Sequence, residues 1–247
     1  MIAALLLGRK GSQGFPGKNT FEVLGHPLCF YPMNAAHETP EIDSVYLSTD
    51  DPELKKIAIE NKVEVIDRPD YLCNNTALGD DAYKHGYEVI RANNSEELEM
   101  VVLLFCNGPM VLPERLSEGI RALRNNPELD SAVSVSRYNM WSPLRARKQM
   151  PDGTLQPFVP FETFGDPKTL NCDRDSQGDV LFADMSFSII RPHCLEKMDE
   201  GLLPQKWMGN KIYPIKQEAA LDVDYEWQIP QVEWWLKKYN KHCQTNK

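Results

Sequence analysis

The sequence lacks several patterns that would assign it to a known class. Its six cysteines are scattered and form no CxxC pair, which argues against a disulfide framework and against a zinc site. Its five histidines have no metal-binding spacing, and no serine stands in a GxSxG pattern. We therefore expect neither a structural zinc protein nor a serine hydrolase.

An excess of positive charge and a long apolar run are also missing. The formal net charge is −9, so long-range repulsion opposes binding to nucleic acids or anionic membranes. The opening apolar run, residues 2–7, is too short to span a membrane and leads into a loop instead of a cleavage site. We expect a cytoplasmic protein with no nucleic-acid and no membrane partner. Any anionic ligand must meet a local cluster of cations.

Short runs rich in Val, Ile and Leu alternate with segments of helical period. Strands are expected at residues 2–8, 43–50, 63–68, 100–107 and 131–137, and helices at 51–62, 80–94 and 112–126. Later, strands are expected near 185–192 and 211–216, with helices near 193–201 and within 227–240, where Pro230 starts or kinks the last one. This alternation predicts an α/β fold, a Rossmann-like, mostly parallel sheet sandwiched by helices, in one domain spanning residues 1–247.

Residues 138–180 interrupt this rhythm. They are rich in proline, glycine and charge and show no clear period. So long an irregular stretch within a compact enzyme predicts a functional flap, a hairpin excursion or a subunit contact. A solvated flap whose charges only maintain solubility is the alternative reading.

The stretch LLLGRKGSQGFPGKN, residues 5–19, runs from an expected strand into a loop with three glycines and three cations. A P-loop requires GxxxxGK[ST], but Ser12 and Asn19 stand at two of the required positions. A dinucleotide fingerprint requires GxGxxG, whereas these glycines are spaced by three. Amides in a glycine-rich turn at a strand end form an anion-binding concavity, flanked here by Arg9 and Lys18. A surface turn with solvated cations remains the alternative.

The loop resembles the ARxGSKGxPxKN signature of the cytidylyltransferases that activate sialic acids and related acidic sugars. The matching positions are Arg9, Gly11, Ser12, Gly14, Pro16, Lys18 and Asn19. Further segments follow the same family in the same order: Ser48, Thr49 and Asp50 in its STD segment, Arg68 and Pro69 after a strand, LCNNTAL for its LASDTAS, and ALDVDYEW for its DIDxxxD. The resemblance extends from residue 2 to about residue 236.

Asp222 and Asp224 are separated by one residue, so in an extended segment both carboxylates face the same side. Two carboxylates with room for water and phosphate oxygens suit Mg²⁺. A helix N-terminus also favours aspartate, and the residues alone leave both readings open. The family order favours metal binding.

The resemblance implies Mg²⁺-dependent transfer of CMP from CTP to the anomeric hydroxyl of an acidic keto sugar, such as a sialic, legionaminic or pseudaminic acid, with release of pyrophosphate. It implies catalytic roles for Arg9, Lys18 and Asp222, with Mg²⁺ held by Asp222 and Asp224. The nucleotide-binding residues it implies are Leu7, Gly8, Arg9, Gly11, Ser12, Gly14, Lys18, Asn19, Asn75 and Asn107. The acceptor-binding residues it implies are Asp184, Ser186, Phe187 and Arg174. It further implies a homodimer in which residues 138–180 reach the partner's acceptor site, with Arg145, Arg147, Lys148 and Arg174 as anion contacts.

Four positions depart from the family pattern on the nucleotide and acceptor walls. Gln13 replaces a lysine, Phe105 a glutamine, Val111 an arginine and Asp184 an asparagine. These changes bear on substrate identity more than on the fold. A CMP-Kdo-type synthetase, a cytidylyltransferase with an unusual acceptor and a catalytically silent nucleotide-binding homologue therefore remain alternatives.

Overall fold

A computed structural model describes residues 1–11, 14–74, 76–176 and 178–243. Seven strands form the central sheet in the order β11-β7-β10-β6-β1-β4-β5. Their bounds are β1 Ile2–Leu7, β4 Ser44–Thr49, β5 Glu64–Asp67, β6 Met100–Phe105, β7 Ser131–Arg137, β10 Leu181–Ile190 and β11 Ile212–Gln217. β10 pairs antiparallel with β6 and β7, and every other pair in this sheet is parallel. The predicted, mostly parallel α/β sheet is confirmed.

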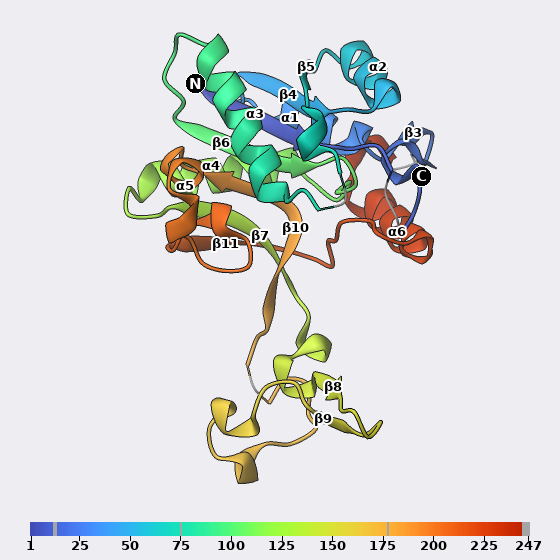
Figure 1. The fold of residues 1–247 in the computed structure, drawn as a ribbon, viewed down its shortest axis with the longest axis vertical. Coiled ribbons are helices and arrows are strands. Elements are labelled where there is room, and N and C mark those ends of the chain that lie inside the picture. Colours follow the sequence, from blue (N-terminus) through green and yellow to red (C-terminus); the bar gives the residue numbers. More distant parts are fainter. Residues whose placement is uncertain (12–13, 75, 177, 244–247) are drawn as a thin grey trace.

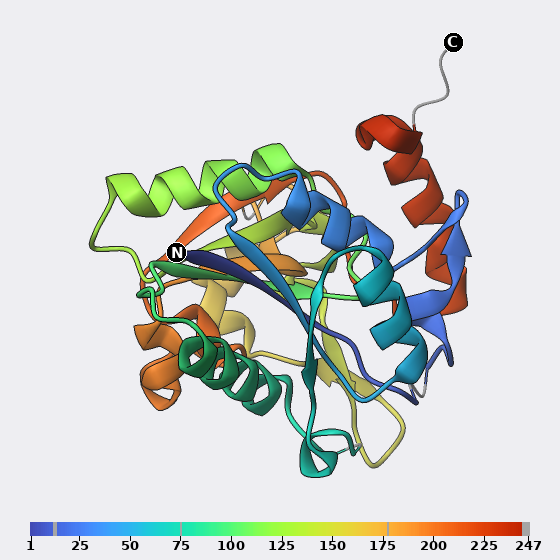
Figure 2. The same cartoon turned by 90° about the horizontal axis from the view of Figure 1, so that it is seen from above.

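Helices cover both faces of the sheet (Figure 2). Alternate residues of β1 explain this, because successive side chains of a strand point to opposite faces. Ile2, Ala4 and Leu6 pack with α1 (Phe30–His37), α2 (Pro52–Glu60) and α4 (Pro113–Asn125). The intervening residues Ala3, Leu5 and Leu7 pack with α3 (Gly79–Asn93) and α5 (His193–Glu196). The sheet is therefore the middle layer of three, as in Rossmann-like folds.

The helix starts follow local chemistry. The carboxylate of Asp51 accepts the N–H of Glu53 at 2.9 Å and caps α2, and Pro113 stands in the first turn of α4. Pro230 lies in the first turn of α6 (Ile229–Tyr239), so it starts this helix and does not kink it. α6 packs in a third apolar cluster with Val23 of the short strand β2 (Glu22–Val23), which pairs with β3 (His26–Pro27). No helix within the described ranges is long and apolar enough to cross a membrane.

Several expected boundaries were wrong. α5 ends at Glu196, although a helix was expected over 193–201, and 3-10 turns follow it. β10 begins at Leu181, four residues before the expected strand, because its first part pairs with the end of β7 ahead of a β-bulge. α1 was not predicted, since its sequence FYPMNAAH has apolar residues on nearly every side and no clear helical period.

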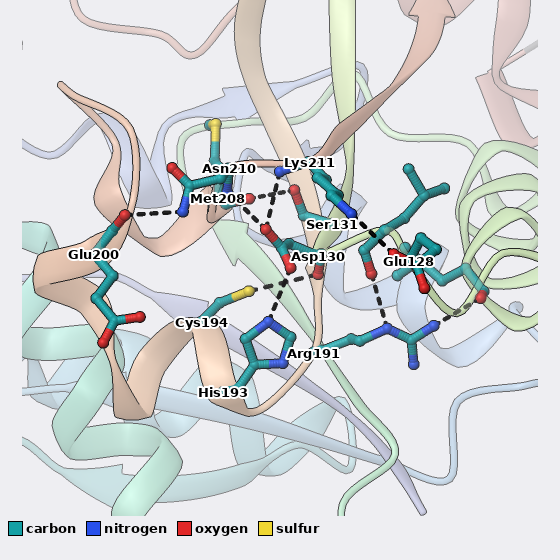
Figure 3. Close-up of polar contacts among 12 residues, drawn as sticks. Glu128, Asp130, Ser131, Arg191, His193, Cys194, Glu200, Met208, Asn210 and Lys211 are labelled. Carbon is teal, nitrogen blue, oxygen red and sulfur yellow. Dashed lines mark hydrogen bonds and ion pairs between the residues drawn. The ribbon is translucent and has the colours of Figure 1, made fainter.

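The edge strand β11 is held beside β7 by a polar cluster around Asp130 (Figure 3). The carboxylate of Asp130 accepts the backbone N–H groups of Asn210 and Lys211 at 2.8 and 2.9 Å. His193 Nε2 lies 3.0 Å from Oδ1 of the same carboxylate. Gly209 makes this close approach possible, because a Cβ there would lie 2.6 Å from that of Asp130. The cluster sets where β11 starts and hence where the segment that follows β11 emerges.

Residues 138–180 leave the sheet at the end of β7 and return at the start of β10, projecting as a long arm (Figure 1). The arm contains a hairpin of β8 (Arg147–Gln149) and β9 (Leu155–Pro157) and several 3-10 turns. β7 runs in the same direction as β1 and β6, so the arm starts from the edge of the sheet where those strands end.

Candidate functional site

A cavity of about 340 Å³ lies where β1, β5 and β6 end. Ligand sites of open α/β sheets occur at this edge because the loops after parallel strands converge there. Its walls come from the loop after β1, the end of β5, the start of α3, the loop after β6 and the segment after β11. They comprise Leu7, Gly8, Arg9, Gly14, Lys18, Asn19, Arg68, Leu72, Ala77, Leu78, Gly79, Ala82, Phe105, Asn107 and Asp224.

The loop after β1 is held against its neighbours at several points. The N–H of Lys10 donates to Asp50 Oδ1 at 2.9 Å, and Asn19 Nδ2 donates to the carbonyl of Arg9 at 3.4 Å. A Cβ at Gly14 would lie 2.7 Å from the backbone oxygen of Asp224. Only glycine lets the loop approach the segment after β11 this closely.

Lys18 and Asp224 join these two segments directly. Lys18 Nζ lies 2.5 Å from Asp224 Oδ1, although 206 positions separate the residues in the chain. The lysine side chain is 12% exposed, whereas that of the aspartate is 55% exposed. An ion pair with one exposed partner adds little stability. The main effect of this pair is therefore to hold the enclosed ammonium group of Lys18 in the cavity wall.

Asp222 lies beside this pair and is more deeply placed. Burial, and then the negative charge of Asp224, raise the pKa of Asp222 to about 6, against the lowering effect of Lys18. Asn107 Nδ2 lies 3.5 Å from Asp222 Oδ2, and the same amide donates to the carbonyl of Val223 at 2.9 Å. The N–H of Val223 donates back to the carbonyl of Asn107 at 2.7 Å. The loop after β6 thus anchors the acidic segment.

Arg68 lines the cavity and was given no site role from the sequence. Its guanidinium donates from Nε to Ser48 Oγ at 3.2 Å and from Nη2 to the carbonyl of Ser48 at 2.6 Å. Burial lowers its pKa, while nearby groups, among them Asp50, act in the opposite direction. Its position directly after β5, an expected parallel strand, could have indicated a site role, because ligands bind at the carboxyl ends of such strands.

The residues predicted to bind the acceptor lie elsewhere. Asp184 is 6% exposed and accepts hydrogen bonds from Ser134 Oγ and Ser136 Oγ at 2.6 and 2.7 Å. Phe187 belongs to the core, and Ser186 is fully buried. Arg174 lies in the arm, exposed and paired with Asp175. The acceptor assignments stay predictions. Because the side chains of Asp184, Ser186 and Phe187 are buried, an acceptor could contact this part of β10 only through the backbone or after a local rearrangement.

Some predicted positions lie outside the cavity wall or outside the described residues. Ser12, Gln13 and Asn75 are not among the described residues. Gly11 is in the loop with a φ of +79° and is not part of the wall. The described residues contain no group of three or more His, Cys, Asp or Glu side chains that could enclose a metal ion.

Comparison with solved structures defines the class of fold. CMP:2-keto-3-deoxy-manno-octonic acid synthetase complexed with CTP is similar with a TM-score of 0.66 and 16% identity, over 96% of this chain and 98% of that one. 4-Diphosphocytidyl-2C-methyl-D-erythritol synthase from Anaerococcus prevotii DSM 20548 is similar with a TM-score of 0.61 and 12% identity, over 96% of each chain. The chain therefore shares the Rossmann-like α/β fold of these two structures.

Comparison of sequences gives the family. The family model described as cytidylyltransferase matches residues 3–187, and the chain belongs to that family. N-acylneuraminate cytidylyltransferase of Oncorhynchus mykiss is 27% identical over 228 residues, covering 92% of this chain and 49% of the relative. N-acylneuraminate cytidylyltransferase A of Danio rerio is 25% identical over 238 residues, covering 94% and 50%. The resemblance found in the motifs is confirmed, and the chain spans about half the length of these curated relatives.

Proposed function

We propose that the protein transfers CMP from CTP to the hydroxyl of an acidic keto sugar and releases pyrophosphate. The observation that carries this proposal is the meeting of Lys18 with Asp224, beside Asp222, at the wall of the cavity where β1 and β6 end. This places an enclosed cation and two carboxylates together in a member of the cytidylyltransferase family.

The triphosphate of CTP binds at the loop after β1 in this proposal. Arg9 and Lys18 offset its charge, and the amides of the glycine-rich loop orient it. Each cation within about 4 Å of a phosphate charge contributes about 4 kcal/mol of Coulomb attraction at an effective dielectric constant of about 20, before desolvation is subtracted. These local contacts act against the repulsion that a polyanion meets from a chain of net charge −9. Catalysis then rests on positioning and electrostatics, with no covalent nucleophile.

The acidic pair after β11 suits Mg²⁺. Its ligand atoms are carboxylate oxygens, and the pKa of Asp222 is raised first by burial and then by the negative charge of Asp224 nearby. Two carboxylates leave the remaining positions for water and phosphate oxygens, which Mg²⁺ prefers over a complete protein cage. Bound there, Mg²⁺ would neutralise charge on the phosphate oxygens as it builds up during the transfer.

For the acceptor we propose a nonulosonic acid, because relatives over nearly the whole chain are named N-acylneuraminate cytidylyltransferases. The homodimer is also part of the proposal. It is supported by the apolar side chains that the arm exposes, among them Trp141 and Phe158, which are 66% and 63% exposed. We also propose a cytoplasmic location, where CTP is available. Cell fractionation tests this part of the proposal.

One assay tests the reaction. The protein is incubated with CTP, Mg²⁺ and, in turn, sialic, legionaminic, pseudaminic and Kdo-type acids, and pyrophosphate release is followed. Release with a nonulosonic acid supports the proposal, and release with the Kdo-type acid alone reassigns the acceptor. Tight CTP binding without release in any mixture identifies a silent nucleotide-binding protein and overturns the proposal.

A further inference from the structure

Asp184 is a buried carboxylate on β10 whose charge is met by hydroxyl and amide donors. Its exposure is 6%. Ser134 Oγ donates to Oδ1 at 2.6 Å, Ser136 Oγ donates to Oδ2 at 2.7 Å, and the N–H of Ser186 donates to Oδ1 at 3.1 Å. Burying a carboxylate costs free energy that hydrogen bonds must offset, and these three donors are all neutral groups.

Ser136 connects this carboxylate to the segment after β11. Its hydroxyl proton is directed at Asp184, which leaves its lone pairs to accept the N–H of Ala220 at 3.1 Å. Tyr138, two positions further along, donates its hydroxyl to the carbonyl of Ala220 at 3.0 Å. Both backbone polar groups of Ala220, a fully buried residue, are therefore held by side chains from the end of β7.

The same segment is held from α6. Gln231 Nε2 donates to the carbonyl of Ala219 at 3.0 Å, and Trp235 Nε1 donates to the carbonyl of Glu218 at 2.8 Å. Ala219 has a φ of +57°, a left-handed conformation that is unfavourable for a non-glycine residue. Such a conformation persists where the surroundings over-determine it, as these contacts do.

We propose that Asp184 is a positioning residue for the metal site. It orients the Ser136 hydroxyl, and with Tyr138 that hydroxyl fixes Ala220, two residues before Asp222. Asn107 holds Val223 on the other side, so the direction of the Asp222 carboxylate is set from both ends. The inference rests on the proposed function, since it assumes that Asp222 and Asp224 bind the metal.

The test is binding of Mn²⁺ in place of Mg²⁺, measured with and without CTP from the electron paramagnetic resonance signal of free Mn²⁺. Ser136→Ala and Tyr138→Phe each remove one contact to Ala220 and should weaken Mn²⁺ binding about tenfold. Ser134→Ala is the matched control, because it removes the other serine contact of Asp184 without touching Ala220, and it should stay within about twofold of wild type.

Asp184 itself is tested by two replacements. Asp184→Ala leaves Ser136 unoriented and should weaken Mn²⁺ binding as Ser136→Ala does. Asp184→Asn can direct its amide oxygen to Ser136 and its amino group to Ser134, whose hydroxyl then donates to the carbonyl of Phe187, 3.1 Å away, although the N–H of Ser186 loses its acceptor. This variant keeps the contact to Ser136 and should therefore weaken Mn²⁺ binding less than Asp184→Ala does, which a general loss of packing would not predict.

The outcomes separate the inference from the function. Wild-type Mn²⁺ binding in both Ser136→Ala and Tyr138→Phe overturns the positioning role. A rise in the KM for the acceptor that is confined to the Asp184 variants also overturns it, because that result identifies a direct contact between Asp184 and the acceptor. A wild-type protein that binds neither CTP nor Mn²⁺ overturns the proposed function and this inference together. If circular dichroism shows that Ser136→Ala does not fold, Tyr138→Phe decides, since it removes a single hydroxyl.

Discussion

Lys18 Nζ lies 2.5 Å from Asp224 Oδ1, and this contact joins the loop after β1 to the segment after β11. In the proposed function, the loop with Lys18 meets the phosphates of CTP and the segment with Asp224 meets their metal ion. In the protein alone they neutralise each other. We expect CTP and Mg²⁺ to exchange this direct pair for contacts to the phosphates and to the metal.

Lys18→Met should therefore weaken CTP binding by about 10- to 100-fold, because hydrogen bonds to charged groups contribute about 1.5–3 kcal/mol. Isothermal titration calorimetry with CTP measures the change. Lys10→Met is the matched control, since Lys10 belongs to the same loop, has an exposed side chain and does not line the cavity. Equal losses in both variants would mean that the loop attracts CTP by overall charge, and the specific role of Lys18 would be abandoned.

Gly14→Ala should lower pyrophosphate release at least tenfold while the protein stays folded. The new Cβ would lie 2.7 Å from the backbone oxygen of Asp224, so the loop and the acidic segment must move apart. Gly79→Ala is the control, because it stands at the start of α3 in the same cavity wall and its Cβ would meet no atom within 4 Å. Unchanged turnover in Gly14→Ala would show that the approach of the two segments is not needed.

Asp222→Asn should stabilise the protein at neutral pH while abolishing its activity. The pKa of Asp222 in the folded protein is about 6, above its ordinary value of 3.8. Between these pH values the folded state binds more protons than the unfolded state, so the protein loses stability as the pH rises from about 4 to 6. Removing the charge should recover roughly 1–3 kcal/mol above pH 6, measured by urea unfolding without metal. At pH 4 the gain should vanish. A gain that is the same at every pH would have another cause.

Phe158→Asp should shift the proposed homodimer toward monomers. Phe158 is 63% exposed on the arm, and burying an aromatic side chain between subunits contributes free energy that a carboxylate there would oppose. Light scattering over a range of concentrations measures the molar mass. Ile59→Asp is the control, since Ile59 is 68% exposed on α2 and should leave assembly unchanged. A wild-type monomer at every concentration would end the cross-subunit proposal.

Much of the fold was predictable because its signals are local. Residues 2–7 form a continuous apolar strand, Asp51 and Pro52 start α2, and Pro230 starts α6. α1 was missed because its burial on several sides hides the helical period. The length of α5 was overestimated, since 3-10 turns take over after Glu196.

The site was predictable only where a motif names it. Lys18, Gly14 and Asn107 stood out from the motifs, and all three line the cavity. Arg68 was matched as part of a motif but given no role, because its place in the cavity depends on β5 lying beside β4. The hydrogen-bond network of Asp184, Ser136 and Ala220 could not be predicted from the sequence, because its members come from three segments that are far apart in the chain.

The sequence by itself determined the layers of this protein and its membership of the cytidylyltransferase family, because apolar period and short motifs are properties of neighbouring residues. The tertiary structure decided which charges meet. Parallel strands deliver the loop with Lys18 and the segment with Asp222 and Asp224 to one edge of the sheet, and the contacts of β7 and α6 with residues 218–220 hold that segment there.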